Sequence, residues 1–184
     1  MSISARHIAS ALSAAALLVL PLAAGAQTPI RVALGGGITM PVGDIAKTAT
    51  SGINLSASLT YEPRRLPFGF ELAGTYHNFL KQDNVESNSV IMAVTGGVTI
   101  PITGTIGKPY LFGGAGYYNT QGPTTGDVDA ERDLGGYGGV GIRFQASRVL
   151  IDVKAAFHEI FADRDTAGRV RSRELIPISI AVIL

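Results

Sequence analysis

Eight segments of alternating polarity, turn-forming residues between them, and a bulky aliphatic face opposite a small-residue face predict an all-β fold. The predicted architecture is an eight-stranded antiparallel up-and-down transmembrane β-barrel. The predicted strands are residues 30–40, 52–62, 68–79, 89–102, 109–119, 133–145, 148–160 and 174–184.

The first residues predict a cleaved secretory signal peptide, residues 1–26. Arg6 and His7 precede an apolar run, residues 11–22, that ends in small residues before Gln27. The run is shorter than the ~20 residues of a membrane-spanning helix, and Pro21 interrupts it. We therefore expect an exported chain with one barrel domain over residues 27–184.

Composition excludes several classes of protein. Outside the signal peptide, which contains Arg6, the chain has 14 basic and 14 acidic residues. This balanced charge gives no indication of a nucleic-acid partner. Cysteine is absent, so disulfides and thiol chemistry are excluded, and backbone pairing and packing alone must hold the exported chain.

The connections between the predicted strands alternate in length. In an up-and-down sheet, alternate connections lie at the same end, which places four long loops opposite three tight turns. This asymmetry is typical of outer-membrane barrels, with short periplasmic turns and longer external loops. The long connections are residues 41–51, 80–88, 120–132 and 161–172, and the short ones are 63–67, 103–108 and 146–147.

The two faces of each strand differ in size and polarity. The opposite face to the bulky one carries mostly Gly, Ala, Ser and Thr, which suits the narrow interior of an eight-stranded barrel; a lipocalin-like carrier would place large apolar groups inside. The bulky face is therefore expected to meet lipid. It includes Ile53, Leu55 and Leu59; Phe70, Leu72 and Tyr76; Val140, Ile142 and Phe144; Val149, Ile151 and Val153; and Ile176, Ile178, Ile180, Val182 and Leu184.

Aromatic residues cluster at both ends of the predicted strands, which is typical of belts at the two lipid interfaces. Tyr61, Phe68, Tyr110 and Phe144 lie beside the short turns, and Tyr76, Phe79, Tyr117, Tyr118, Phe157 and Phe161 lie beside the long loops.

Five charged residues fall on the inward face: Glu62, Glu71, Arg143, Asp152 and Lys154, with Arg31 as a further candidate. Buried charge is costly unless it is paired, so the mixed signs predict an internal network of ion pairs and hydrogen bonds. Small barrels usually fill their interiors with side chains, which favours a plug over an ion path or gate.

Two motifs suggest cofactors or metals, and neither has the required context. The segment GYGGVG, residues 136–141, has dinucleotide-loop spelling, but a strand rather than a helix follows it. Its glycines are expected to make room for neighbouring aromatic rings. Residues 127–133 have alternating acidic groups without EF-hand spacing, which favours a solvated loop over calcium binding. We expect no cofactor and no metal.

Three segments carry a family resemblance: PYLFGGAGYYN at 109–119, GGYGGVGIRF at 135–144 and ELIPISIAVIL at 174–184. Behind a signal peptide, they resemble the small eight-stranded OmpA/OmpX-like, porin-family barrels of the Gram-negative outer membrane. The resemblance implies a monomer with periplasmic termini, a structural or surface-interaction role with four external loops, and insertion by the outer-membrane assembly machinery. That machinery reads a terminal aromatic residue, where this chain has Leu184.

Two other activities of such barrels are weighed as alternatives. One is a narrow channel for ions or small solutes. The other is a lipid A-modifying enzyme, whose His and Ser face lipid as base and nucleophile. Here His77 and His158 face inward with no serine close in sequence, so we expect no catalytic residues.

The last long loop is rich in arginine: Arg164, Arg169, Arg171 and Arg173. Guanidinium groups suit lipopolysaccharide phosphates, and an ordinary solvated loop is an equal alternative. The expected partners are thus outer-membrane lipids and lipopolysaccharide.

The final strand is expected to close the barrel against residues 30–40. Pro177 cannot donate a backbone hydrogen bond, which predicts a bulge or a gap in pairing there.

Overall fold

The structure is a computed structural model that describes residues 29–43, 45–47, 49–81, 89–104, 107–121, 131–164 and 170–184. The predicted signal peptide, residues 1–26, lies outside these ranges. Within them, no helix is long and apolar enough to cross a membrane.

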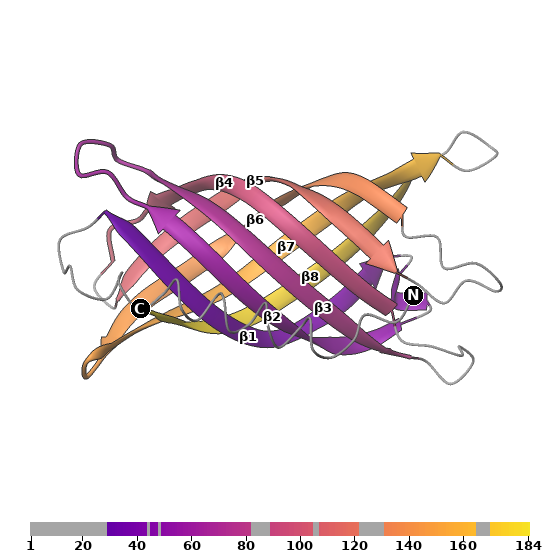
Figure 1. The fold of residues 1–184 in the computed structure, drawn as a ribbon, viewed down its shortest axis with the longest axis horizontal. Coiled ribbons are helices and arrows are strands. Elements are labelled where there is room, and N and C mark those ends of the chain that lie inside the picture. Colours follow the sequence, from indigo (N-terminus) through magenta and orange to yellow (C-terminus); the bar gives the residue numbers. More distant parts are fainter. Residues whose placement is uncertain are drawn as a thin grey trace, which may run out of the picture.

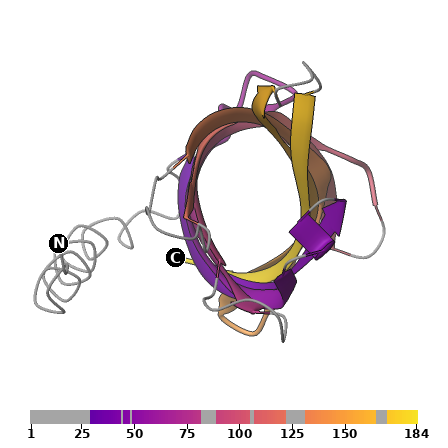
Figure 2. The same cartoon turned by 90° about the vertical axis from the view of Figure 1, so that its right-hand side faces the viewer.

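The eight strands form one closed antiparallel barrel in which each strand pairs with its neighbours in sequence and β1 pairs with β8. Figure 1 shows the tilted strands from the side, and Figure 2 shows the closed ring from one end. The predicted fold class is confirmed. The strands are β1 (Ile30–Gly43), β2 (Ala49–Tyr61), β3 (Gly69–Lys81), β4 (Ser89–Pro101), β5 (Lys108–Gln121), β6 (Glu131–Ala146), β7 (Val149–Arg164) and β8 (Val170–Ile183).

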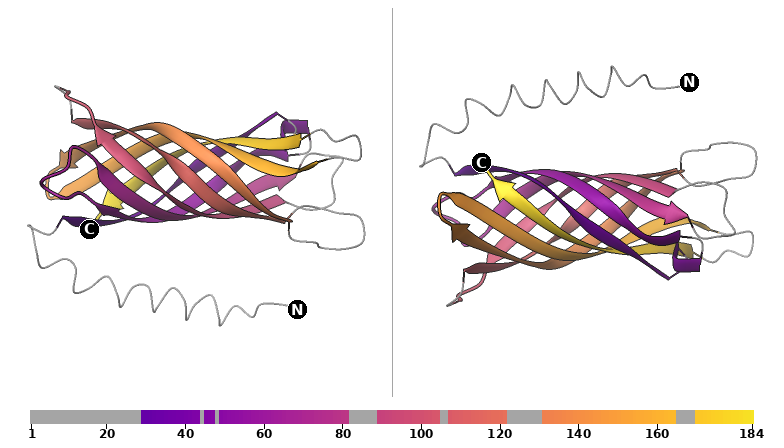
Figure 3. Two further views of the ribbon diagram at one scale, coloured as in Figure 1. Left: turned by 90° about the horizontal axis from the view of Figure 1, so that it is seen from above. Right: turned by 90° about the horizontal axis from the view of Figure 1, so that it is seen from below.

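The barrel has two distinct ends. The β2–β3, β4–β5 and β6–β7 connections lie at the end where β1 begins and β8 finishes, which we call the turn end; the opposite end is the loop end (Figures 1 and 3). The strands run further than the sequence predicts at the loop end. The first long connection, expected at 41–51, shrinks to residues 44–48 around the short 3-10 helix η2 (Ile45–Lys47), because β1 stays paired with β8 through Gly43 and β2 pairs with β3 from Ala49.

The predicted lipid face is exposed on the outside of the barrel. Ile53 and Val94 are each 60% exposed, and Leu72 and Ile180 are each 56% exposed. The intervening residues, such as Glu71, point inward and are buried. The alternation therefore identifies the two faces correctly.

Three members of the predicted aromatic belts are on the other face. Tyr110, Phe79 and Tyr118 are fully or almost fully buried in the barrel interior. Tyr117, next to Tyr118, is 46% exposed, because consecutive residues of a strand point to opposite faces. The aromatic belts are thus thinner, and the interior bulkier, than the sequence indicates.

The final strand closes the barrel as predicted. Its register with β1 runs without interruption and includes the pair Thr39–Pro177. On its other edge, the pairing with β7 breaks between Ala155–Ile178 and His158–Leu175. The register is the same on both sides, so Pro177 causes a gap in pairing and not a bulge.

Candidate functional site

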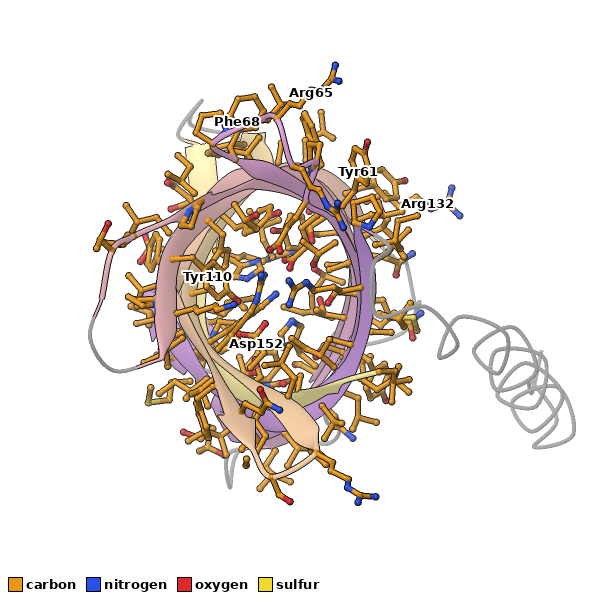
Figure 4. All side chains as sticks on the ribbon, turned by 90° about the vertical axis from the view of Figure 1, so that its left-hand side faces the viewer. Tyr61, Arg65, Phe68, Tyr110, Arg132 and Asp152 are labelled. Carbon is orange, nitrogen blue, oxygen red and sulfur yellow. The ribbon has the colours of Figure 1, made fainter. Side chains whose placement is uncertain are left out.

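The barrel interior, or lumen, is the candidate site, and its turn-end half is charged. Figure 4 looks into the barrel from the turn end and shows side chains filling the centre, with Tyr110 and Asp152 among those that point inward. The five charged residues singled out in the sequence are contributed by or directly follow four different strands, and the structure brings all of them together here. They are Glu62, Glu71, Arg143, Asp152 and Lys154.

Arg143 is the centre of the first group of ion pairs. Its guanidinium contacts Glu62 through Nη1, and its Nε lies 3.6 Å from Oδ2 of Asp152. Arg31 holds the other oxygen of Glu62 at 3.2 Å. Only 6% of Arg143 is exposed, so water does little to stabilise its charge and the two carboxylates must do so.

Lys154 joins this group to Glu71. Its Nζ donates to Oε2 of Glu71 at 2.5 Å and lies 3.9 Å from Oδ2 of Asp152. The Thr60 hydroxyl also donates to Glu71, at 3.3 Å. Including Arg31, three cations face three carboxylates, so the network carries no net charge.

Tyr110 belongs to this network, although the sequence analysis placed it in a lipid-facing belt. Its hydroxyl donates to the carboxylate of Asp152, with both oxygens at 2.8 Å, and the guanidinium of Arg143 lies 4.3 Å from the centre of its ring. The signal for this placement is strand parity: Tyr110 shares a face with Gly114 and Gly116, which leave the interior room for rings.

The glycines of the GYGGVG region provide the space for these rings. Gly141 pairs with Tyr110 across β5 and β6, and a Cβ on Gly141 would stand 2.3 Å from the tyrosine ring. Gly139 pairs with Phe112, and a Cβ there would stand 2.7 Å from the Phe112 ring. This arrangement agrees with the structural interpretation of the motif.

The middle of the lumen holds a cluster of histidine and tyrosine rings. His158 stacks on Tyr137, with ring centres 5.3 Å apart, and its Nδ1 is hydrogen-bonded to the Tyr118 hydroxyl at 2.8 Å. His77 bonds through Nδ1 to the Thr39 hydroxyl at 2.8 Å, whereas its buried Nε2 has no hydrogen-bond partner among the described residues. The histidine rings are 6.3 Å apart.

An apolar cluster closes the loop-end half of the lumen. It consists of inward-facing side chains at most 4% exposed, and Ile45 of η2 packs against it. We call this cluster the apolar plug. Its members are Phe79, Ile91, Ala93, Tyr118, Ile160 and Leu175.

Between the plug and the ion pairs lies a cavity of about 60 Å³. Ser56, Ser58 and Ser179 line it together with both histidines, yet neither histidine is hydrogen-bonded to a serine in the described part of the chain. Such a cavity holds one or two waters, since a liquid water occupies about 30 Å³. No cluster of three or more His, Asp or Glu suited to a metal occurs among the described residues.

The loop-end arginines are only partly described. Arg173 on β8 lies 3.6 Å from Asp133 of β6. Arg164 and Arg171 lie within β7 and β8 respectively, at the loop end. Arg169 lies outside the described residues.

Comparison with known proteins agrees with the barrel geometry. The profile of the family described as "Outer membrane protein beta-barrel domain" matches residues 10–156. No curated protein matches the chain.

Three solved structures share the fold at low sequence identity. Neisserial surface protein A (NspA) superposes with a TM-score of 0.63 at 12% identity, covering 85% of this chain and 97% of that one. Ail, the attachment invasion locus protein of Yersinia pestis, gives 0.54 at 14% identity, covering 84% and 97%. A major outer membrane protein of Thermus thermophilus gives 0.50 at 11% identity, covering 84% and 98%. The resemblance found in the sequence is therefore confirmed.

Proposed function

This chain belongs to the outer membrane protein beta-barrel domain family, and on that premise we propose that it has a structural or surface-interaction role in the bacterial outer membrane. In this proposal the turn end and both termini are periplasmic, and the four loop-end connections are displayed outside the cell. The two most similar structures reported above are a surface protein and an attachment protein by name, which supports such a role.

The observation that carries the proposal is the filled lumen. Paired charges occupy its turn-end half, the apolar plug occupies its loop-end half, and the cavity of about 60 Å³ between them is too small for a solute. A lumen filled with side chains in this way supports a scaffold more than a conduit, since conduction needs a continuous wetted path.

Catalysis is not part of the proposal. An acyl-transferring serine must lie within hydrogen-bond reach of its base and must meet the acyl chain of the lipid. Nδ1 of His158 is engaged by Tyr118 instead, and the serines near it line the interior cavity. Neither histidine is at the outer, lipid-facing surface.

The loops are proposed to contact lipopolysaccharide through arginine. The candidates for phosphate contacts are Arg164, Arg169, Arg171 and Arg173, of which Arg173 lies beside Asp133.

Membrane fractionation with heat-modifiability tests the barrel in its membrane. The protein is expected in the outer-membrane fraction, with a gel mobility that differs between unboiled and boiled samples. Recovery in the soluble periplasmic fraction without detergent would contradict the proposal.

Planar-bilayer recording separates the scaffold from the channel alternative. Wild-type protein is expected to be silent. Steady conductance that changes when Arg143 or Lys154 is neutralised would instead establish an ion path through the charged network. The enzyme alternative predicts altered lipid A, by mass spectrometry, on overproduction, with loss in His158→Ala; we expect unaltered lipid A.

A further inference from the structure

The turn end presents a set of exposed basic side chains, which we call the basic rim: Arg64 and Arg65 in the β2–β3 turn, Lys108 at the start of β5, and Arg148 in the β6–β7 turn. All four are exposed, and none makes an ion pair or side-chain hydrogen bond with another described residue. Lys108 also lines the lumen mouth beside Glu62 and Arg143, without an ion pair to Glu62.

Two tight turns fix the backbone positions of Arg64, Arg65 and Arg148. The amide of Leu66 donates to the carbonyl of Pro63 at 3.1 Å, so Arg64 and Arg65 are the two central residues of a β-turn. In the β6–β7 hairpin, Ala146 pairs with Val149, which leaves Ser147 and Arg148 at the tip. Ser147 has the left-handed φ of 58° that such tight turns use.

The turn-end connections contain no acidic residue that could neutralise the positive charge of the basic rim. Residues 63–69, 101–109 and 145–150 contain no Asp or Glu, and Glu62 is already bound by Arg31 and Arg143. The loop-end connections have the opposite balance. Residues 44–48, 82–88, 122–130 and 165–169 contain six acidic residues and two basic ones by sequence.

The rim borders the lipid-facing band. Tyr61, Leu66 and Ile102 at this end are 43–45% exposed. In Figure 4, Arg65 projects outward from the wall beside Phe68, whereas Tyr110 and Asp152 point into the lumen. Cations at the edge of an apolar band with aromatic neighbours sit at the depth of lipid headgroups.

We propose that the basic rim binds the phosphate-bearing headgroups of anionic phospholipids in the leaflet at the turn end. Charge complementarity and the outward projection of Arg65 favour lipid over a partner seated on the lumen mouth, which Lys108 lines. The inference needs the barrel to be in a membrane, but it does not need the surface role proposed above.

Lipid retention in native mass spectrometry tests this. The mature chain is reconstituted in vesicles of equal phosphatidylglycerol and phosphatidylcholine with identical acyl chains, extracted in mild detergent, and its bound lipids are counted. A basic residue near an anionic surface contributes up to about a fivefold preference. We expect several-fold enrichment of phosphatidylglycerol, which weakens in 0.5 M salt because the Debye length falls to a few Å.

The decisive variant replaces Arg64, Arg65, Lys108 and Arg148 by Gln and is expected to retain both lipids about equally. Its heat-modifiability should match wild type, since the four side chains form no ion pair or side-chain hydrogen bond with another described residue.

The control replaces Lys47, Lys81 and Arg132, the loop-end basic residues outside the set proposed to contact lipopolysaccharide, by Gln and should keep the enrichment. Equal retention of both lipids by wild type, or the same loss in the control, would overturn the proposal. So would rim-dependent cosedimentation with purified peptidoglycan sacculi without any lipid preference, which would assign the rim to the cell wall.

Discussion

The two halves of the lumen fill the same narrow space with opposite chemistry. In the turn-end half, Arg143 and Asp152 are buried as members of a neutral network in which each charge has a partner. In the loop-end half, Phe79 and Leu175 are fully buried by packing alone. A buried charge depends on specific partners, whereas an apolar side chain depends on volume, so the two halves should respond differently to substitution.

The largest expected effect is in the charged half. Arg143→Met leaves Glu62 and Asp152 close together without the cation between them, and breaking a buried pair in this way costs about 3–5 kcal/mol. The free energy of unfolding from vesicles, by guanidinium titration, measures the loss. Arg31→Met is the matched control: its side chain is 34% exposed, so about 1 kcal/mol or less is expected. Equal losses would mean that burial does not distinguish the two arginines.

The apolar half should show a smaller loss. Leu175→Ala removes side-chain volume from the plug and leaves a cavity, at an expected cost of about 3 kcal/mol in the same titration. Leu72→Ala, on the lipid face, should cost about half as much, because acyl chains fill the space that the side chain vacates. A loss for Leu72→Ala as large as for Leu175→Ala would show that the plug is loosely packed.

The smallest expected effect is at Gly141, where the backbone of the barrel wall lies against the ring of Tyr110. Gly141→Ala places a methyl 2.3 Å from the ring of Tyr110, which two contacts to Asp152 hold in position, so a cost of about 1–3 kcal/mol follows from overpacking. Gly74→Ala is the control, since a Cβ there has no neighbour within 4 Å. Its stability should change by less than about 0.5 kcal/mol. A neutral Gly141→Ala would mean that Tyr110 is free to move.

The fold was predictable because each of the eight strands shows the same local signals. These are the alternation of polar and apolar residues, the segment length and the turn-forming residues at its ends. The inward charges were predictable from the same alternation. Lys154, for example, lies between the apolar residues Val153 and Ala155, so it belongs to the polar face that points inward. Tyr118 was harder to place, because Tyr117 beside it has the same polarity and only the shared parity with Gly114 and Gly116 indicates the inward face. Partners such as Tyr110 and Asp152 depend on registers between strands far apart in sequence, which no local pattern encodes.

The pairing of β1 with β8 also bears on the time course of folding. Every other strand pair is a hairpin between consecutive segments, whereas this seam joins residues 33–43 to residues 173–183. Closing so long a loop is entropically costly and slow, and we expect it to form last. Until then β1 and β8 each expose an unpaired edge, so the chain in transit needs protection from self-association until both strands have reached the bilayer.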